Sequence, residues 1–323
     1  MFDKLIRDAL VSIFAVVSTS GLMAQPYPTK PIRLSVGFSP GGSTDVVARI
    51  FGQKLAEAIG QPVVIDNRVG AGGSIATDQV AKAEPDGYRI LMLASGTMTH
   101  SVLSKNVPYN LPKDFTPITY VAASPLVLVV NNALPTRSVS ELIQLARSKP
   151  GELTYGSEGL GGISHLATSQ FSLMTDIKLT HVPFKSATES TAAIAGGQID
   201  MNIPSLTSAL PLLRAEKYRA LAVTSLKRSS LLPSIPTLDE SGLKGFDQVA
   251  WLGFVGPAGM PKSVVERLNM EFIKIANLPE VREALAKQAM EVQIRSSEEF
   301  GTFLREISIN TLRLAKNVQF KLD

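Results

Sequence analysis

The sequence predicts an α/β protein with two domains, each built around a doubly wound sheet. Three observations support this class. The chain has 323 residues, enough for two domains at roughly 150 residues each. Strand-like and helix-like patterns alternate from Pro31 onward, as in α/β architectures. A unit of strand, glycine pair and helix occurs twice, once in each candidate domain, which predicts two similar loops facing one cleft.

The first series of elements has the order βαβαβ. Residues 32–36 alternate like a strand, and residues 45–59 carry apolar side chains at every fourth position, which predicts a helix. Residues 63–65 form a second strand, and a helix follows over about 72–83. The apolar run 88–94 is typical of a strand buried on both faces of a parallel sheet.

The second series repeats this alternation. A continuous apolar run over 126–130 predicts a buried strand, and Ser138 with Glu141 fits a capping box at a helix start. The end of the chain is predicted to be mainly helical, with an apolar face after Pro261 and a final helix over about 298–317. The other predicted elements are strands over 153–156, 180–184, 199–203 and 220–224 and helices over 164–174 and 187–195.

Residues 1–24 have the pattern of a secretory signal peptide. Lys4 and Arg7 give a positive start, residues 9–17 form a short apolar run, and small residues lead to Ala24 at the predicted cleavage site. The run is shorter than the ~20 residues that a membrane span needs. We therefore expect an exported, periplasmic protein; the alternative is an ordinary amphipathic helix at the N-terminus.

Composition excludes several classes of function. Apolar residues make up 45% of the chain and charged residues 19%, as in a globular protein. Cysteine is absent, which excludes disulfides, zinc–thiolate sites, iron–sulfur clusters and thiol nucleophiles. With only three histidines, we expect no metal and no cofactor. The net charge of +4 comes without a basic block, so nucleic acid is not an expected partner.

The two glycine pairs, Gly41-Gly42 and Gly161-Gly162, each precede a predicted helix. Glycines let backbone approach a ligand closely, and the first N–H groups of the helix then face it from the positive end of the helix dipole. Neither pair matches a Walker loop or a dinucleotide fingerprint, so a small carboxylate is favoured over a nucleotide. The alternative for either loop is a capped turn without a ligand. The hydroxyl groups that could add donors are those of Ser43, Thr44 and Ser164.

Signals for catalysis are weak. Neither H-E-x-x-H nor G-x-S-x-G occurs in the chain. Ser164 and His165 are adjacent on a predicted helix, where neighbours diverge by about 100°, so we expect His165 to cap or line the loop. Asp200 lies near a predicted strand start and fits either a ligand acceptor or a loop anchor.

Six segments together match a known pattern: YPTKPIRLSVGFSPGGSTDVVAR, NRVGAGGSIA, AEPDGYRILM, YRALAVTS, SIPTLDESGLKGF and WLGFVGPAGMPK. Over residues 27–317 the chain resembles the Bug family of periplasmic solute receptors, the extracytoplasmic components of tripartite tricarboxylate transporters. The resemblance implies a two-lobed, type II periplasmic binding protein-like fold. We assign residues 25–123 plus 251–323 to the first lobe and 124–250 to the second.

The resemblance also implies a site and partners. A carboxylate would be held between the two glycine-rich loops, partly through ordered waters, and the receptor would deliver it to membrane permease subunits. We expect a monomer that performs no chemistry; the rival hypothesis is a secreted or cytosolic α/β enzyme acting on a phosphorylated or carboxylate substrate. The loop residues expected to bind the ligand are Phe38, Ser39, Gly41, Gly42, Ser43, Thr44, Asp45, Ser157, Gly159, Gly161, Gly162, Ser164 and His165.

One departure from the family pattern affects ligand choice. Relatives often have V-P-Y-K-G-G where this chain has V-P-F-K-S-A at 182–187. Lys185 could meet a second anionic group, which favours a dicarboxylate, and Phe184 offers an apolar face; the alternative is that Lys185 is simply solvated. The residues expected around the far end of the ligand are Ser95, Thr97, Phe184, Lys185, Ser186 and Ser205, and Asp200 completes the expected ligand-binding set.

Overall fold

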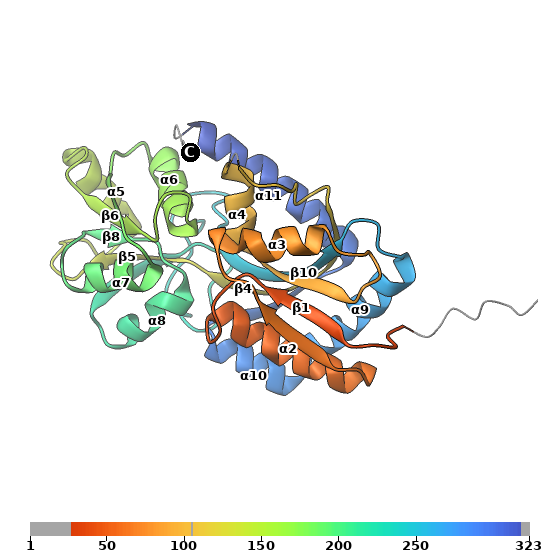
Figure 1. Ribbon diagram of the computed structural model, residues 1–323. Helices are drawn as coiled ribbons and strands as arrows, with labels where there is room; N and C mark the ends of the chain where they lie inside the picture. The colour runs from red at the N-terminus through yellow and green to blue at the C-terminus, as the bar shows by residue number, and fades with distance from the viewer. Residues whose placement is uncertain (1–26, 105, 318–323) are drawn as a thin grey trace, which may run out of the picture.

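The computed structural model describes residues 27–104 and 106–317, and Figure 1 shows two lobes side by side. Each lobe has one sheet with helices on both faces, so the predicted two-lobed α/β fold is confirmed. The predicted signal peptide, residues 1–24, lies outside the described residues.

The first lobe is built on a six-stranded sheet in the order β11-β4-β10-β3-β1-β2. Strand β1 runs parallel to β2 and β3, whereas β10 is antiparallel to both β3 and β4. Its strands are β1 (Ile32–Val36), β2 (Val63–Asn67), β3 (Arg89–Ala94), β4 (Phe115–Pro125), β10 (Val249–Pro257) and β11 (Glu291–Arg295). Its helices are α2 (Ser43–Ile59), α3 (Ser74–Ala81), α4 (Ser95–Leu103), α9 (Lys262–Ala276), α10 (Pro279–Lys287) and α11 (Ser297–Asn317), with the 3₁₀ turn η1 (Ala71–Gly73) before α3.

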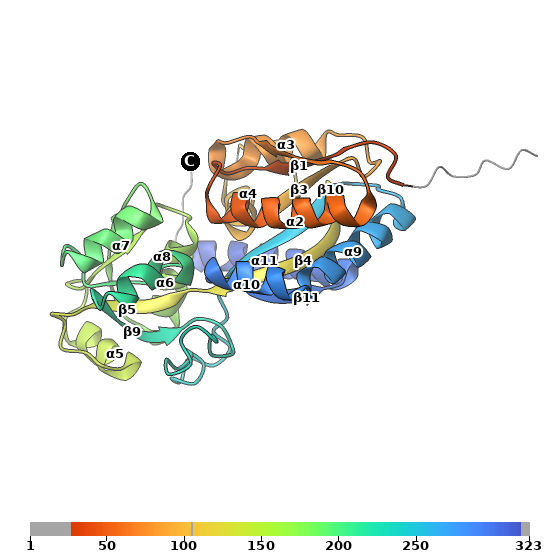
Figure 2. The same ribbon diagram turned by 90° about the horizontal axis from the view of Figure 1, so that it is seen from below.

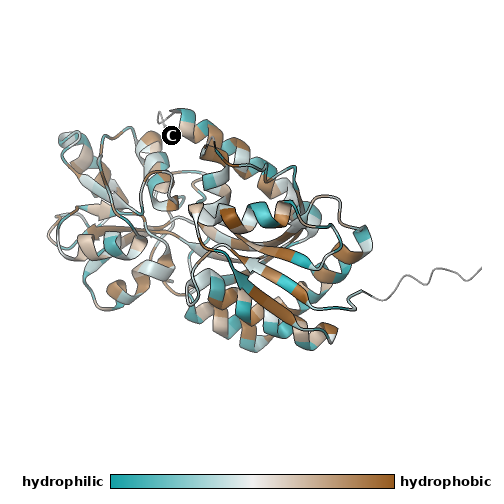
Figure 3. Cartoon of the chain, in the orientation of Figure 1, coloured by the Kyte–Doolittle hydropathy of each residue, from teal (hydrophilic) through white to brown (hydrophobic). Residues whose placement is uncertain are grey.

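Strand β3 separates two cores. Ile90 and Met92 pack in the core that contains α2, α9 and α10, whereas Leu91 and Leu93 pack against α3, α4 and α11 on the other face. Successive side chains of a strand point to opposite faces of the sheet. A strand covered on both faces therefore needs an unbroken apolar run, and Figure 3 shows such apolar strands between the helices of this lobe.

The second lobe has a five-stranded sheet in the order β7-β6-β8-β5-β9. Its strand β5, which lies between β8 and β9, sends Leu128 and Val130 into one core and Val127 and Val129 into the other. Its strands are β5 (Val127–Asn131), β6 (Thr154–Ser157), β7 (Thr180–Pro183), β8 (Met201–Asn202) and β9 (Tyr218–Val223). Its helices are α5 (Val139–Ser148), α6 (Ile163–Thr175), α7 (Ala187–Ala195) and α8 (Leu206–Arg214).

Two chain crossings connect the lobes, one from β4 into β5 and one from β9 back to β10 (Figure 2). Thr224 ties them together. Its N–H donates to the carbonyl of Leu126 at 3.0 Å, and its hydroxyl accepts from the Leu126 N–H at 2.8 Å. The same hydroxyl lies 2.5 Å from the carbonyl oxygen of Gln248. The crossings therefore form one joint with a buried side chain at its centre.

The end of the chain differs from the prediction. Helices α9 and α11 do return to the first lobe, as expected, but this part of the chain also supplies two strands of the first sheet. Strand β10 lies inside the sheet, between β4 and β3, and β11 forms one edge. Because β10 enters from the second lobe, it runs against β3, and the sheet is mixed rather than parallel. Within the described residues, no helix is both long and apolar enough to span a membrane.

Candidate functional site

The two glycine loops follow β1 and β6, and the carboxyl ends of these strands face the other lobe. In the first lobe, Ala94 at the end of β3 pairs with Leu252, close to where β10 arrives from the second lobe. In the second lobe, Ser205 follows β8 and bridges to Leu126, where the chain arrives from the first lobe. Ligands of α/β sheets bind at the carboxyl ends of the strands, so the space between the lobes is the candidate site.

The first loop, between β1 and α2, is fixed by Asp45. The Asp45 carboxylate is almost fully buried and accepts from the Gly41 N–H at 2.9 Å, Arg49 Nε at 2.8 Å and Asn67 Nδ2 at 2.8 Å. Burial would raise the pKa of Asp45, but the hydrogen bonds from Arg49, Gly41 and Asn67 hold it below its ordinary value. Asp45 was expected to bind ligand; the structure instead turns its carboxylate back into the loop.

The start of α2 is open toward the space outside the loop. Gly42 is the N-cap residue, with φ −71° and ψ 161°, and no side chain caps the helix there. Ser39, Gly41 and Gly42 are exposed, and Ser43 is half-buried. The first N–H groups of a helix have no partner within the helix. The loop therefore presents donors at the positive end of α2, as the sequence predicts for an anion site.

The second loop, between β6 and α6, uses its donors internally. Gly159 and Gly161 have φ +105° and +76°, a region that favours glycine. The Gly159 N–H donates to Ser157 Oγ at 3.1 Å, and the Gly161 N–H donates to His165 Nδ1 at 3.3 Å. The two loops are therefore alike in position and different in what they offer a ligand.

Glu158 is a residue of this site that the sequence analysis missed. Its Oε1 accepts from the Ser164 N–H, in the first turn of α6, at 3.0 Å. A Cβ at Gly162 would lie only 2.6 Å from this oxygen, so the glycine makes room for the Glu158 side chain. An acidic residue shortly before a predicted helix start was the signal that could have identified it.

Two histidines and a tyrosine form an aromatic cluster behind this loop. The His181 ring stacks on Tyr155, at 4.8 Å, and on His165, at 4.1 Å between centroids, and Tyr155 and His165 are themselves 6.0 Å apart. His181 Nε2 is 2.7 Å from Ser157 Oγ. Burial, and then the neighbouring His181, lowers the pKa of His165 to about 4. The expectation that His165 lines the loop is confirmed, because its ring accepts from the loop backbone.

Three expected distal residues lie on the loop between β7 and α7. Lys185 is exposed, and its backbone N–H donates to Glu189 Oε2 at 3.0 Å. Ser186 is the N-cap of α7, where its hydroxyl accepts from the Glu189 N–H at 3.2 Å. Phe184 is half-buried and packs against the core of β5 and α8. Phe184 is therefore held against the lobe core, with part of the residue left exposed.

The remaining expected distal residues lie at two helix starts. Ser95 begins α4, and Ser205 is the N-cap of α8, with its hydroxyl 3.0 Å from that of Ser208. Thr97 is buried, and a Cβ at Gly73 would lie 2.5 Å from its hydroxyl oxygen. The Thr97 hydroxyl thus packs against η1 inside the first lobe.

Asp200 acts as a loop anchor, the second of its two predicted roles. Its Oδ2 accepts from both the backbone N–H and the hydroxyl of Thr154, each at 2.8 Å. Thr154 is the first residue of β6, whereas the glycine loop follows the last residue, Ser157. Asp200 therefore sits at the opposite end of the strand from the site, and including it among the ligand-binding residues was wrong.

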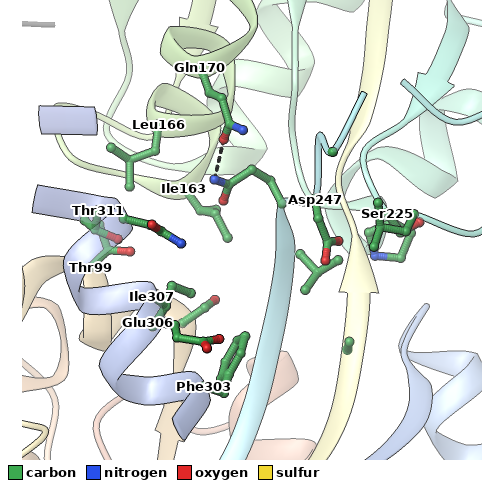
Figure 4. Close-up of a pocket in the computed structure, with 18 of the residues that line it drawn as sticks. Thr99, Ile163, Leu166, Gln170, Ser225, Asp247, Phe303, Glu306, Ile307 and Thr311 are labelled. Atoms are coloured by element: carbon green, nitrogen blue, oxygen red, sulfur yellow. Dashed lines mark hydrogen bonds between the residues drawn. The ribbon is translucent and has the colours of Figure 1, made fainter. Parts of the chain in front are cut away.

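A cavity of about 920 Å³ lies beside the joint between the lobes (Figure 4). The walls of the cavity come from α4, α6, β11 and α11 and from part of the second crossing. At this wall Gln248 Nε2 donates a hydrogen bond to Gln170 Oε1 of α6 at 2.6 Å. Asp247 lines it, and burial raises the pKa of this carboxyl. Of the predicted site residues only Ser95 lines this cavity, but Ile163, which directly follows the second glycine pair, lines it too.

The described ranges, 27–104 and 106–317, contain no group of three or more His, Asp or Glu side chains arranged to hold a metal ion. The polar groups at the loops are backbone N–H groups and hydroxyls, which suit an anion. The arrangement can bind and orient a small acid.

The fold and the paired loops define a receptor of the type II periplasmic binding protein class. The chain matches the family described as "Tripartite tricarboxylate transporter family receptor" over residues 47–319. It belongs to this family, and the resemblance to the Bug proteins is confirmed.

Three similar proteins illustrate the relationship. Protein BugT of Bordetella pertussis is 34% identical over 92% of this chain and 93% of its own length. The solved structure of R. palustris Rpa4515 with adipate has a TM-score of 0.78 and 33% identity, covering 91% of this chain and 99% of that one. MatC (Rpa3494) from Rhodopseudomonas palustris, with bound malate, has a TM-score of 0.74 and 29% identity, covering 89% and 99%.

Proposed function

We propose that this protein is a periplasmic solute receptor that binds a small dicarboxylate between its lobes and delivers it to the permease of a tripartite tricarboxylate-type transporter. In this proposal it is exported, acts as a monomer and catalyses no reaction. The lobes are residues 25–123 plus 251–323 and residues 124–250. Tricarboxylates and aromatic acids are further ligand classes to test.

The observation that carries the proposal is the open start of α2. A ligand carboxylate there would accept from backbone N–H groups beside Gly42 and from the hydroxyls of Ser43 and Thr44, without needing a charged side chain. Asp45 supports this reading, because it shapes the loop and its charge is offset by Arg49. The relatives with adipate and malate hold four- to six-carbon dicarboxylates, which favours this ligand class.

Binding to both lobes would couple the ligand to closure. Contacts with both loops form together only when the lobes approach, so the ligand stabilises the closed state by its differential affinity. The joint at Thr224 connects the two lobes, and the cavity lies beside it. A closing movement of the lobes would therefore change the structure at both places.

A thermal-shift screen over small carboxylates tests the proposal. A ligand that binds only the folded state raises the melting temperature, and calorimetry with product analysis then separates binding from turnover. Binding of a dicarboxylate without chemical change supports the receptor. Conversion of the acid would favour the rival α/β enzyme.

A further inference from the structure

The carboxylate of Glu158 occupies the place at the start of α6 where the second loop was expected to receive a ligand. Its Oε1 accepts from the Ser164 N–H at 3.0 Å, and its chain lies against Gly162, with Cγ and Cδ each 2.7 Å from where a Cβ would stand. The N–H groups of Gly159 and Gly161 also donate within the loop, to Ser157 and His165. The second lobe thus already holds an anion.

Glu158 is held less firmly than its counterpart in the first lobe. Asp45 accepts three hydrogen bonds and pairs with Arg49. By contrast, Glu158 Oε2 is buried and accepts no hydrogen bond from any described residue, and no lysine or arginine among them pairs with this side chain. A buried oxygen without a donor is costly, so the bound position of Glu158 is only half satisfied.

Glu158 lies where the chain turns out of β6 into the loop. It is half-buried and is followed by Gly159 at φ +105° and an exposed Leu160. A side chain in this place can rotate toward solvent without disturbing the buried strand β6 behind it.

We propose that Glu158 is a resident carboxylate that competes with the ligand for the start of α6, and that it thereby determines which acids bind. This inference rests on the proposed function. A ligand carboxylate reaches the Ser164 N–H only when Glu158 moves away, so an acid binds more weakly than the two loops would otherwise allow. Acids whose carboxylate binds only weakly at the start of α2 are therefore excluded from the site.

Calorimetric titration of adipate, malate and succinate into the whole mature protein tests the competition. Glu158→Ala opens the start of α6, and we expect its dissociation constants to fall at least fivefold. Glu158→Gln keeps the shape and removes the charge, so we expect a smaller gain. The matched control is Glu152→Gln, which removes the same charge from an exposed position of the same lobe that pairs with Lys149.

The outcomes separate this inference from the proposed function. Tighter binding by both Glu158 variants, with Glu152→Gln unchanged, supports the competition. Unchanged or weaker binding, with a lower melting temperature, means that Glu158 is only a helix cap; the receptor function then stands on the wild-type titration. If neither the wild type nor Glu158→Ala binds any of the three acids, both proposals fail for this ligand class.

Discussion

The imidazole rings of His165 and His181 stack face to face, with centroids 4.1 Å apart and planes inclined by 14°. Burial lowers the pKa of both rings, and the ring of His181 lowers that of His165 further. A nearby Glu158 acts in the opposite direction on His181. The stack is therefore held together by neutral rings, and a proton on either one opposes it.

Acid should destabilise the protein through this stack. The pKa of His165 falls from 6.5 to about 4 on folding, so between these values the unfolded chain binds more protons. The contribution of His165 is complete above pH 6.5 and is lost as pH falls toward 4, by about 1.4 kcal/mol per pH unit for one proton. Urea unfolding of wild type and His165→Asn between pH 7 and 4.5 should show a shallower slope in the variant.

His100→Asn is the control for the loss of a histidine elsewhere, because it removes one from α4 of the first lobe. The slope of His165→Asn is compared with that of this variant as well as with that of the wild type. Equal slopes for wild type and His165→Asn would show that His165 does not titrate in this range.

Asp45→Asn should loosen the first loop. The substitution keeps the size of the side chain but places an amide among three donors and removes the partner of Arg49. A hydrogen bond to a charged group contributes about 1.5–3 kcal/mol, and we expect the free energy of unfolding to fall by about this amount. Urea denaturation measures it, with Glu283→Gln, in the exposed Glu283–Lys287 pair, as the control that stays near wild type. A loss no larger than that of the control would mean that the loop does not depend on Asp45.

Gly42→Val should abolish carboxylate binding in a folded protein. The backbone at Gly42 has φ −71°, which any residue adopts, and a Cβ there would meet only the Ser39 carbonyl, at 3.3 Å. The valine branches would fill the space in front of the α2 N–H groups. Gly196→Val is the matched control, since that position has φ −85° and a similar contact of 3.4 Å with a backbone oxygen. Calorimetry that finds near-wild-type affinity in Gly42→Val would mean that the loop is only a turn.

The sequence predicts local features well because their partners are close in the chain. Ser138 caps α5 by accepting from the Glu141 N–H at 3.2 Å, and Glu141 in turn accepts from the Arg137 N–H. The strands of the first series and both glycine loops are found where their patterns predicted them.

The failures have long-range causes. The role of Asp200 depends on Thr154, 46 positions away, and no local pattern reveals that pair. Strand β10 was missed because its register depends on β3 and β4, and because Gly253 is placed to accommodate the ring of Phe300 rather than to favour a strand. Glu158 was missed because its contact with Ser164 exists only once the loop has turned back on itself.

The mature chain should begin near Gln25, outside the cytoplasm. The reason is the order of positive residues, short apolar run and small residues before Ala24. Fractionation of the native host, followed by N-terminal sequencing of the purified protein, measures both points. An intact Met1 in a cytoplasmic fraction would contradict the prediction.

Lys185→Met should weaken binding of dicarboxylates and leave monocarboxylates unaffected. The loop around Lys185 is fixed by Glu189, which accepts from the Lys185 N–H, while the exposed ammonium group forms no ion pair with any described residue. If it meets the far carboxylate of the ligand, that charge-assisted contact contributes about 1.5–3 kcal/mol, or roughly a ten- to hundredfold change in affinity. Methionine keeps the apolar stem and removes the charge.

The control is Lys178→Met, an equally exposed lysine just ahead of β7, at the end of the sheet away from the site. Equal affinities of wild type and Lys185→Met for the best dicarboxylate would show that Lys185 is simply solvated, and selectivity for the second carboxylate would then have to come from neutral donors.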